Sequence, residues 1–196
     1  MPLLVVPALP AGSLAAQEQP HLSVRPGLAL RPWRDDDAPA VQAAFDCPAI
    51  QRWHVRRLDS DDEARAWTGQ WAGRWRAETA ASWAIVDADD RPVGQVGLRG
   101  VLLDEASAQL SYWVVPAARG RGIATESLLA LTRWSFTRGG LHRLALEHST
   151  ANAASCRVAA RAGFSEEGVA RASVRHADGW HDMHLHARLR TDGPIR

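Results

Sequence analysis

The stretch PAARGRGIATES (residues 116–127) lies between a predicted strand and a predicted helix. Residues 107–115 are rich in β-formers, and residues 123–138 carry apolar side chains at helical spacing. Backbone N–H groups at a helix start are unpaired and carry partial positive charge, and nearby glycines let an anion approach closely. The two arginines would add charged donors for phosphate oxygens. This junction alone is compatible with a phosphate site or with a solvated turn.

Two common phosphate-binding motifs do not fit this junction. A P-loop requires a lysine directly after its last glycine, and the chain contains no lysine. The dinucleotide-binding motif Gly-x-Gly-x-x-Gly would require glycine where Thr125 stands. A phosphate ligand at this junction would therefore be bound in some other way.

A second motif follows about 30 residues later in LEHSTANAASCRVAARAGF (residues 146–164). A predicted strand is followed by Asn152, Ser155 and an alanine-rich helix that ends at Gly163. Together with Arg119–Ala124, which matches the pattern [QR]-x-x-G-x-[GA], this order resembles the GNAT superfamily of N-acetyltransferases. The resemblance covers about residues 28–189 and is greatest for the branch typified by the ribosomal-protein acetyltransferases RimJ and RimL.

The periodicity predicts one α+β domain with a mainly antiparallel sheet. Strands are expected at 28–33, 82–87, 93–101, 107–115, 142–148, 164–174 and 181–189, and helices at 34–45, 59–78, 123–138 and 152–162. Residues 49–57 are expected to form a loop or a helical turn. The resemblance implies the GNAT fold: a mixed sheet of about seven strands, with helices on both faces, that splays between the fourth and fifth strands.

The expected domain spans residues 28–190. Residues 1–27 are expected to form an extended arm, with a short strand at 3–6, that covers the substrate cleft or joins an interface; residues 191–196 form a tail. Trp67, Trp71 and Trp75 recur every four residues, which predicts a helix face directed toward the core.

The resemblance implies that acetyl-CoA is the co-substrate. The strand end at 113–115 would hydrogen-bond the pantetheine, the loop and helix start at 119–125 would bind the pyrophosphate, and Arg157 would reach the 3′-phosphate. The expected CoA-binding residues are Trp113, Val114, Val115, Arg119, Gly120, Arg121, Gly122, Ile123, Ala124, Thr125, Asn152, Ser155 and Arg157. Asn152 is equally suited to cap its own helix. No metal is expected.

The catalytic residues are less clearly marked. Ser155 stands where the branch places a serine near the CoA sulfur, so it or a water is expected to stabilise the thiolate. The branch often carries a glutamate where this chain has Gln109, which cannot accept a proton. Glu147, His148 and His54 are the alternative general bases, and strand alternation allows only one of the first two to face the cleft. The oxyanion is expected to bind the backbone N–H near Val115.

The expected reaction is direct acetyl transfer to a primary amine of a small molecule, a protein N-terminus or a lysine. Trp53 and His54 are the expected substrate-binding residues, and Arg52, Arg56 and Arg57 would suit a succinyl or other acidic acyl donor. A catalytically weak CoA-binding module and an antibiotic-modifying enzyme are the alternatives.

The composition of the chain argues against some classes of binding partner. The chain of 196 residues has 23 basic and 22 acidic residues, so its net charge of +1 does not favour nucleic-acid binding. No apolar run approaches the ~20 residues that span a bilayer, so no membrane association is expected. Only two cysteines are present, compatible with a cytoplasmic protein. The resemblance also implies a homodimer.

Overall fold

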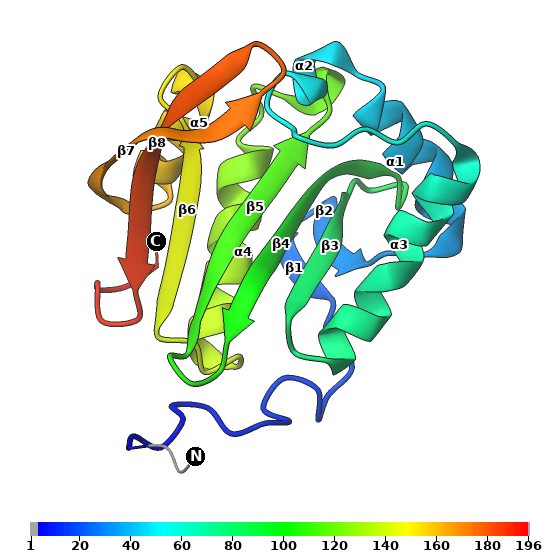
Figure 1. The fold of residues 1–196 in the computed structure, drawn as a ribbon. Coiled ribbons are helices and arrows are strands. Elements are labelled where there is room, and N and C mark those ends of the chain that lie inside the picture. Colours follow the sequence, from blue (N-terminus) through cyan, green and yellow to red (C-terminus); the bar gives the residue numbers. More distant parts are fainter. Residues whose placement is uncertain (1–3, 196) are drawn as a thin grey trace.

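The computed structural model describes residues 4–195, which form an eight-stranded mixed sheet flanked by helices (Figure 1). The strands are β1 (Leu22–Arg25), β2 (Leu28–Pro32), β3 (Ala80–Val86), β4 (Pro92–Leu102), β5 (Ser107–Val114), β6 (Arg143–Ser149), β7 (Ser165–His176) and β8 (Gly179–Leu189). The helices are α1 (Ala38–Phe45), α2 (Pro48–Gln51), α3 (Asp61–Arg76), α4 (Ile123–Thr137) and α5 (Ala153–Arg161), with 3-10 turns at Asp35–Asp37 and Pro116–Ala118. The predicted α+β class is confirmed.

The strand order is β1-β2-β3-β4-β5-β6-β8-β7, and β5 and β6 form the parallel pair. Their pairing covers only Ser107–Leu110 with Arg143–Leu146, although both strands continue beyond it. The C-terminal parts of β5 and β6, beyond Leu110 and Leu146, therefore diverge. We call this opening the β5–β6 gap. The predicted splay between the fourth and fifth expected strands is confirmed there.

Strand alternation divides the interior into two cores. On β3, Trp83 and Ile85 belong to the core beneath α4, whereas Ala84 and Val86 belong to the core beneath α1 and α3. Neighbouring side chains of a strand point to opposite faces, so the fully buried β3 must be covered on both sides. The predicted placement of helices on both faces is confirmed.

The tryptophan stripe of α3 lies in these cores. Trp71 and Trp75 are buried, and Trp67 packs edge-on against Trp33 at 5.0 Å between ring centroids. The core-facing prediction for this stripe is confirmed. Among the described residues, neither α3, with 16 residues, nor any other helix has the length and apolar character that a bilayer crossing requires.

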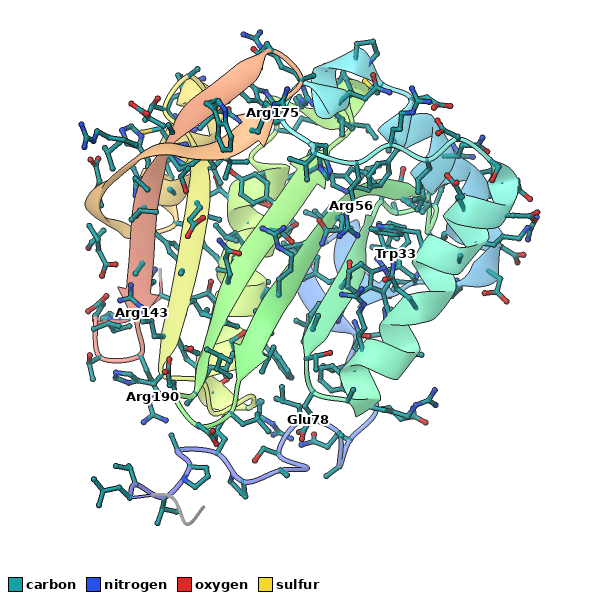
Figure 2. All side chains as sticks on the ribbon, in the orientation of Figure 1. Trp33, Arg56, Glu78, Arg143, Arg175 and Arg190 are labelled. Atoms are coloured by element: carbon teal, nitrogen blue, oxygen red, sulfur yellow. The ribbon has the colours of Figure 1, made fainter. Side chains whose placement is uncertain are left out.

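The N-terminal segment differs from the expected separate arm. Leu22–Arg25 forms β1 and pairs with β2, which is why the sheet has eight strands rather than seven. Upstream, the Glu78 carboxylate accepts hydrogen bonds from the backbone N–H groups of Gly12, Leu14 and Ala15 at 2.6–3.1 Å. Glu78 lies at the end of the sheet away from α2, beside the N-terminal segment (Figure 2).

The predicted strand at 3–6 falls partly outside the described residues, and residues 4–6 are not in a strand. Val6 is exposed, whereas Leu14 is buried in the α4 core. At the other terminus the guanidinium of Arg188 donates to the carbonyls of Gly193 and Pro194. Both terminal segments therefore pack against the domain.

A buried ion pair fixes the start of α1. Arg31 donates two hydrogen bonds to Asp37, at 2.7 and 2.9 Å, and both side chains are buried. Arg31→Met would leave the Asp37 carboxylate buried without its cation, so we expect the free energy of unfolding to fall by about 3–5 kcal/mol. Urea denaturation measures this change, and Arg65→Met, which removes an exposed pair with Asp61, is the control expected to change it little.

Candidate active site

A large cavity of about 630 Å³ occupies the β5–β6 gap. Its wall is formed by β4, β5, β6, the α2 region, the start of α4, α5 and the β7–β8 hairpin. Every expected CoA-binding residue lines it except Val115 and Arg121. The expected catalytic residues Ser155, Glu147 and His148 and the expected substrate residues Trp53 and His54 line it as well. The fold thus brings residues from seven regions of the chain to one place.

The loop before α4 has the backbone that the glycines predict. Gly120 and Gly122 have φ angles of +78° and +77°, which glycine adopts at little cost. Gly122 is the N-cap of α4, and a Cβ added there would lie 2.9 Å from Glu126 Oε1. The unpaired N–H groups at this helix start can bind an anion that approaches along the glycine backbone.

The two loop arginines differ in position. Arg119 folds back, and its Nε donates to the carbonyl of Val114 at 2.9 Å. Arg121 is exposed, outside the cavity wall. In this arrangement Arg119 ties the loop to the end of β5, so the backbone N–H groups rather than its guanidinium are placed to meet a phosphate.

Helix α5 carries a serine that contacts β5. Asn152 Oδ1 accepts from Ser155 N at 3.1 Å, so Asn152 caps the helix as well as lining the cavity. Ser155 Oγ lies 2.8 Å from Tyr112 Oη, and burial raises the pKa of Tyr112 to about 12. Sequence reasoning missed Tyr112. The available signal was its spacing: it lies two residues before Val114 and so shares its strand face.

The candidate bases on β6 point to opposite faces of the sheet. Glu147 is exposed on the face of Gln109, while His148 is buried on the face of α5. Burial lowers the pKa of His148, whose Nε2 lies 3.1 Å from His186 Nε2. Arg99, a cavity residue that sequence reasoning also missed, reaches to 3.5 Å from Gln109 Oε1.

The α2 region closes the cavity opposite β6. His54 packs edge-on against Phe45 at 5.1 Å between ring centroids, and burial lowers its pKa to about 4. Trp53 lies 6.3 Å, centroid to centroid, from both His176 and His181 of the β7–β8 hairpin. Two segments more than 100 residues apart therefore meet over the cavity.

The backbone N–H groups at the end of β5 face different edges of the strand. The backbone N–H of Val115 donates to the carbonyl of Val93 at 3.0 Å, so it is already paired within the sheet. Adjacent strand residues direct their backbone groups to opposite edges. The N–H of Val114 therefore faces the β5–β6 gap and is the backbone donor near Val115 that a ligand in the gap can reach.

The sequence and the structure were compared with those of known proteins, and both resemble acetyltransferases. The family model of the acetyltransferase (GNAT) domain matches residues 27–165. The chain belongs to the GNAT acetyltransferase family. Mycobacterium smegmatis RimJ, solved in complex with CoA-disulfide, superposes on this GNAT domain with a TM-score of 0.83 at 25% identity, over 89% of this chain and 90% of that one.

Curated proteins of similar sequence are also named as acetyltransferases. The uncharacterized N-acetyltransferase YoaA of Bacillus subtilis is 27% identical over 74% of this chain and 82% of its own length. The ribosomal-protein-serine acetyltransferase of Escherichia coli is 27% identical over 56% of this chain and 61% of its own. This GNAT protein is an acetyltransferase of the RimJ/RimL-like branch, as the sequence motifs indicated.

Proposed function

We propose that this GNAT protein transfers the acetyl group of acetyl-CoA directly to a primary amine, with the N-terminus of a protein as the acceptor. The observation that carries this proposal is the cavity that joins the Gly120–Gly122 loop to Glu147 through the β5–β6 gap. The name of the E. coli relative, a ribosomal-protein-serine acetyltransferase, supports a protein acceptor.

The two faces of the gap suit the two substrates. The pyrophosphate of CoA would bind the N–H groups at the start of α4, and the pantetheine would lie along the unpaired edge of β5. The acceptor would enter from the face that carries Glu147 and is covered by Trp53 and His54. The acceptor nitrogen attacks the thioester carbonyl carbon, the C–N bond forms, and the C–S bond then breaks to release CoA thiolate.

Glu147 is our proposed general base, acting directly or through one water. It is exposed in the cavity wall on the acceptor side, whereas His148 faces α5. His54 also lines the acceptor side, but a pKa of about 4 makes its imidazole a weak proton acceptor at neutral pH. The N–H of Val114 would stabilise the negative charge that develops on the thioester oxygen.

Tyr112 and Ser155 are placed to stabilise the leaving thiolate. Because the pKa of Tyr112 is raised to about 12, its hydroxyl keeps its proton and can donate to Ser155. The Ser155 hydroxyl is then free to donate to the sulfur. A pair of hydroxyls polarised in this way would be a better donor than an isolated serine.

Ser155→Ala is expected to lower kcat about 10–100-fold, because one hydrogen bond to the developing charge is lost. The dissociation constant of CoA should stay nearly unchanged, because binding rests mainly on the loop and pantetheine contacts. Tyr112→Phe should give a smaller loss in kcat, since it removes only the group that polarises Ser155. Steady-state kinetics with calorimetric CoA binding measures both effects, and equal losses in CoA affinity would contradict the assignment.

The structure partly supports the use of a succinyl or other acidic acyl donor. Of the three arginines expected to meet a distal carboxylate, Arg57 pairs with Asp59 at 2.7 Å and Arg52 stacks on Trp53 at 4.8 Å. Arg56 lies over the face of the sheet (Figure 2), and Arg99 lines the cavity. Arg56 and Arg99 are therefore the residues that would favour a succinyl group or an acidic acceptor.

The test is the release of CoA from acetyl-CoA and succinyl-CoA with a panel of acceptors. N-terminal peptides with a free α-amine should be acetylated faster than lysine peptides, polyamines or aminoglycosides. Turnover only with an aminoglycoside would favour the antibiotic-modifying alternative. Tight CoA binding without turnover on any amine would favour the CoA-binding module and overturn the proposal.

Cytoplasmic location and a homodimer belong to the same proposal. A ribosomal-protein acceptor would place the enzyme where ribosomes are made. The relation to the RimJ/RimL-like branch is the support for the dimer, and analytical ultracentrifugation of the full chain measures its mass in solution.

A further inference from the structure

A compact cluster of three histidines and one cysteine lies between α5 and the sheet. His148 on β6 is paired in register with His184 on β8, and His186 follows two residues later on the same strand face. Cys156 comes from α5, which covers this face. The consecutive elements β6 and α5 and the more distant β8 thus contribute metal-ligating side chains to one point.

The distances within this cluster suit one tetrahedral ion. One ligand atom from each residue lies within 4.8 Å of all the others. Nε2 of His148 and Nε2 of His186 are 3.1 Å apart. With Zn–N bonds of 2.0–2.1 Å, two nitrogens on a tetrahedral zinc lie about 3.3 Å apart.

The ring positions give an independent comparison. The centroids of the three imidazoles are separated by 5.0, 5.3 and 5.9 Å. Imidazoles that share a tetrahedral zinc through one nitrogen each have centroids about 5 Å apart, given the same bond length. The three centroid separations therefore lie close to the value expected for three imidazoles that share one ion.

Hydrogen bonding leaves ligand nitrogens available. His148 Nδ1 lies 2.9 Å from the carbonyl oxygen of Ser149, which can only accept, so Nδ1 carries the proton and Nε2 carries the lone pair. Without a metal this lone pair can accept a hydrogen bond from His186 Nε2, 3.1 Å away, and a bound ion would take the place of that proton. This backbone contact is the usual support for a metal-binding histidine. Nδ1 of His184 and Nδ1 of His186 are buried without a hydrogen-bond partner within the described residues. The hydrogen bonds of the cluster therefore satisfy His148 but leave one buried nitrogen on each of His184 and His186 unpaired within the described residues.

We propose that His148, Cys156, His184 and His186 bind one transition-metal ion, with Zn²⁺ as the best match. Imidazole and thiolate are the ligands that zinc prefers, and four protein ligands form the closed set of a structural site. Because His148 and His186 are buried, the ion would be shielded from solvent on the side of the sheet. Zinc would tie α5 to β6 and β8, and so fix the helix that carries Ser155 next to Cys156.

The test uses the full chain without a histidine tag, stripped with a chelator and then supplied with Zn²⁺ or Co²⁺. We expect one zinc per chain by elemental analysis after gel filtration, and a rise in Tm on zinc addition. The Co²⁺ form should show the intense visible bands of a tetrahedral site and a thiolate-to-cobalt charge-transfer band. A stripped chain that retains no stoichiometric zinc and shows no rise in Tm would overturn the proposal.

Substitutions of single residues test which side chains bind the metal. Cys156→Ser should abolish the charge-transfer band, and His184→Gln should weaken zinc binding by more than about 100-fold, since even supporting residues of metal sites contribute 10–100-fold. Cys47→Ser and His181→Gln are matched controls outside the cluster and should bind as the unchanged chain does. Binding that is insensitive to Cys156→Ser and His184→Gln, or lost equally in the controls, would contradict the site. Circular dichroism of the metal-free variants checks their folding, and the result for the unchanged chain decides the proposal if a variant does not fold.

Discussion

Gly122→Asp is expected to weaken CoA binding by more than about 100-fold, because placing like charges against each other costs several kcal/mol. The new Cβ would meet Glu126 Oε1 at 2.9 Å, so the Glu126 side chain must move aside. The new carboxylate would also compete with a phosphate for the N–H groups at the start of α4. Isothermal titration calorimetry with CoA measures the change directly.

The control for this variant is Gly100→Asp. Gly100 also has a positive φ, +54°, and a Cβ there meets nothing within 4 Å. It lies on β4 and is not part of the cavity wall. Both variants carry the strain of a left-handed aspartate and the same added charge, but only Gly122→Asp should lose CoA. Unchanged affinity in Gly122→Asp would remove the pyrophosphate from this loop.

Glu147→Gln is expected to lower kcat/KM for the amine by about 10²–10⁴-fold, the usual contribution of a general base. Glutamine keeps the size and polarity of the side chain but cannot accept the proton of the attacking amine. CoA affinity should stay unchanged, because Glu147 lies on the opposite face of the gap from Ser155 and Tyr112. Initial rates at saturating acetyl-CoA, with the amine varied, measure this loss.

Two further variants distinguish Glu147 from the neighbouring titratable groups. Glu105→Gln removes an exposed carboxylate in the β4–β5 turn and should leave the rate unaltered. His54→Gln should reduce the rate less than Glu147→Gln, because its imidazole is already a weak base. If His54→Gln abolished turnover while Glu147→Gln did not, the proton would pass to His54 instead.

The sequence predicted those parts of the fold that depend on local patterns and on two contiguous motifs. The strand–loop–helix at 107–138 and the capped helix after Asn152 appear within a few residues of their expected bounds. Both signals are local, since capping, glycine conformation and helical periodicity act over a few residues. The overall fold, including the β5–β6 gap, was then predicted from the resemblance that the order of the two motifs shows.

What the sequence could not predict depends on register between distant segments. Tyr112 meets Ser155 across 43 residues, and the histidine cluster forms only because β8 pairs with β6 beneath α5. One residue of register also decides whether Val114 or Val115 turns its N–H into the gap. Such choices are set by tertiary packing, because a shift of one position reverses every side chain and backbone group of a strand.

The N-terminal segment is a similar case. Its proline-rich composition gave no periodic signal, yet Glu78 binds three of its N–H groups and Trp83 Nε1 donates to the carbonyl of Pro20. These contacts depend on α3 and β3, more than 50 residues away. Glu78 and its N–H donors lie at the end of the sheet distant from the cavity (Figure 2), and none of residues 4–27 lines the cavity. Of the two roles expected for this segment, the structure does not support covering the cleft, and a part in an interface stays a prediction.

The short pairing of β5 with β6 has a kinetic consequence. Because the two strands part after Leu110 and Leu146, the cavity opens to both faces of the sheet. In the proposed reaction each substrate has its own entrance and the acetyl group passes directly from the thioester to the amine, so both substrates must be bound together before any product leaves. Double-reciprocal plots at several acetyl-CoA concentrations should therefore intersect rather than run parallel, and either product should be able to depart first.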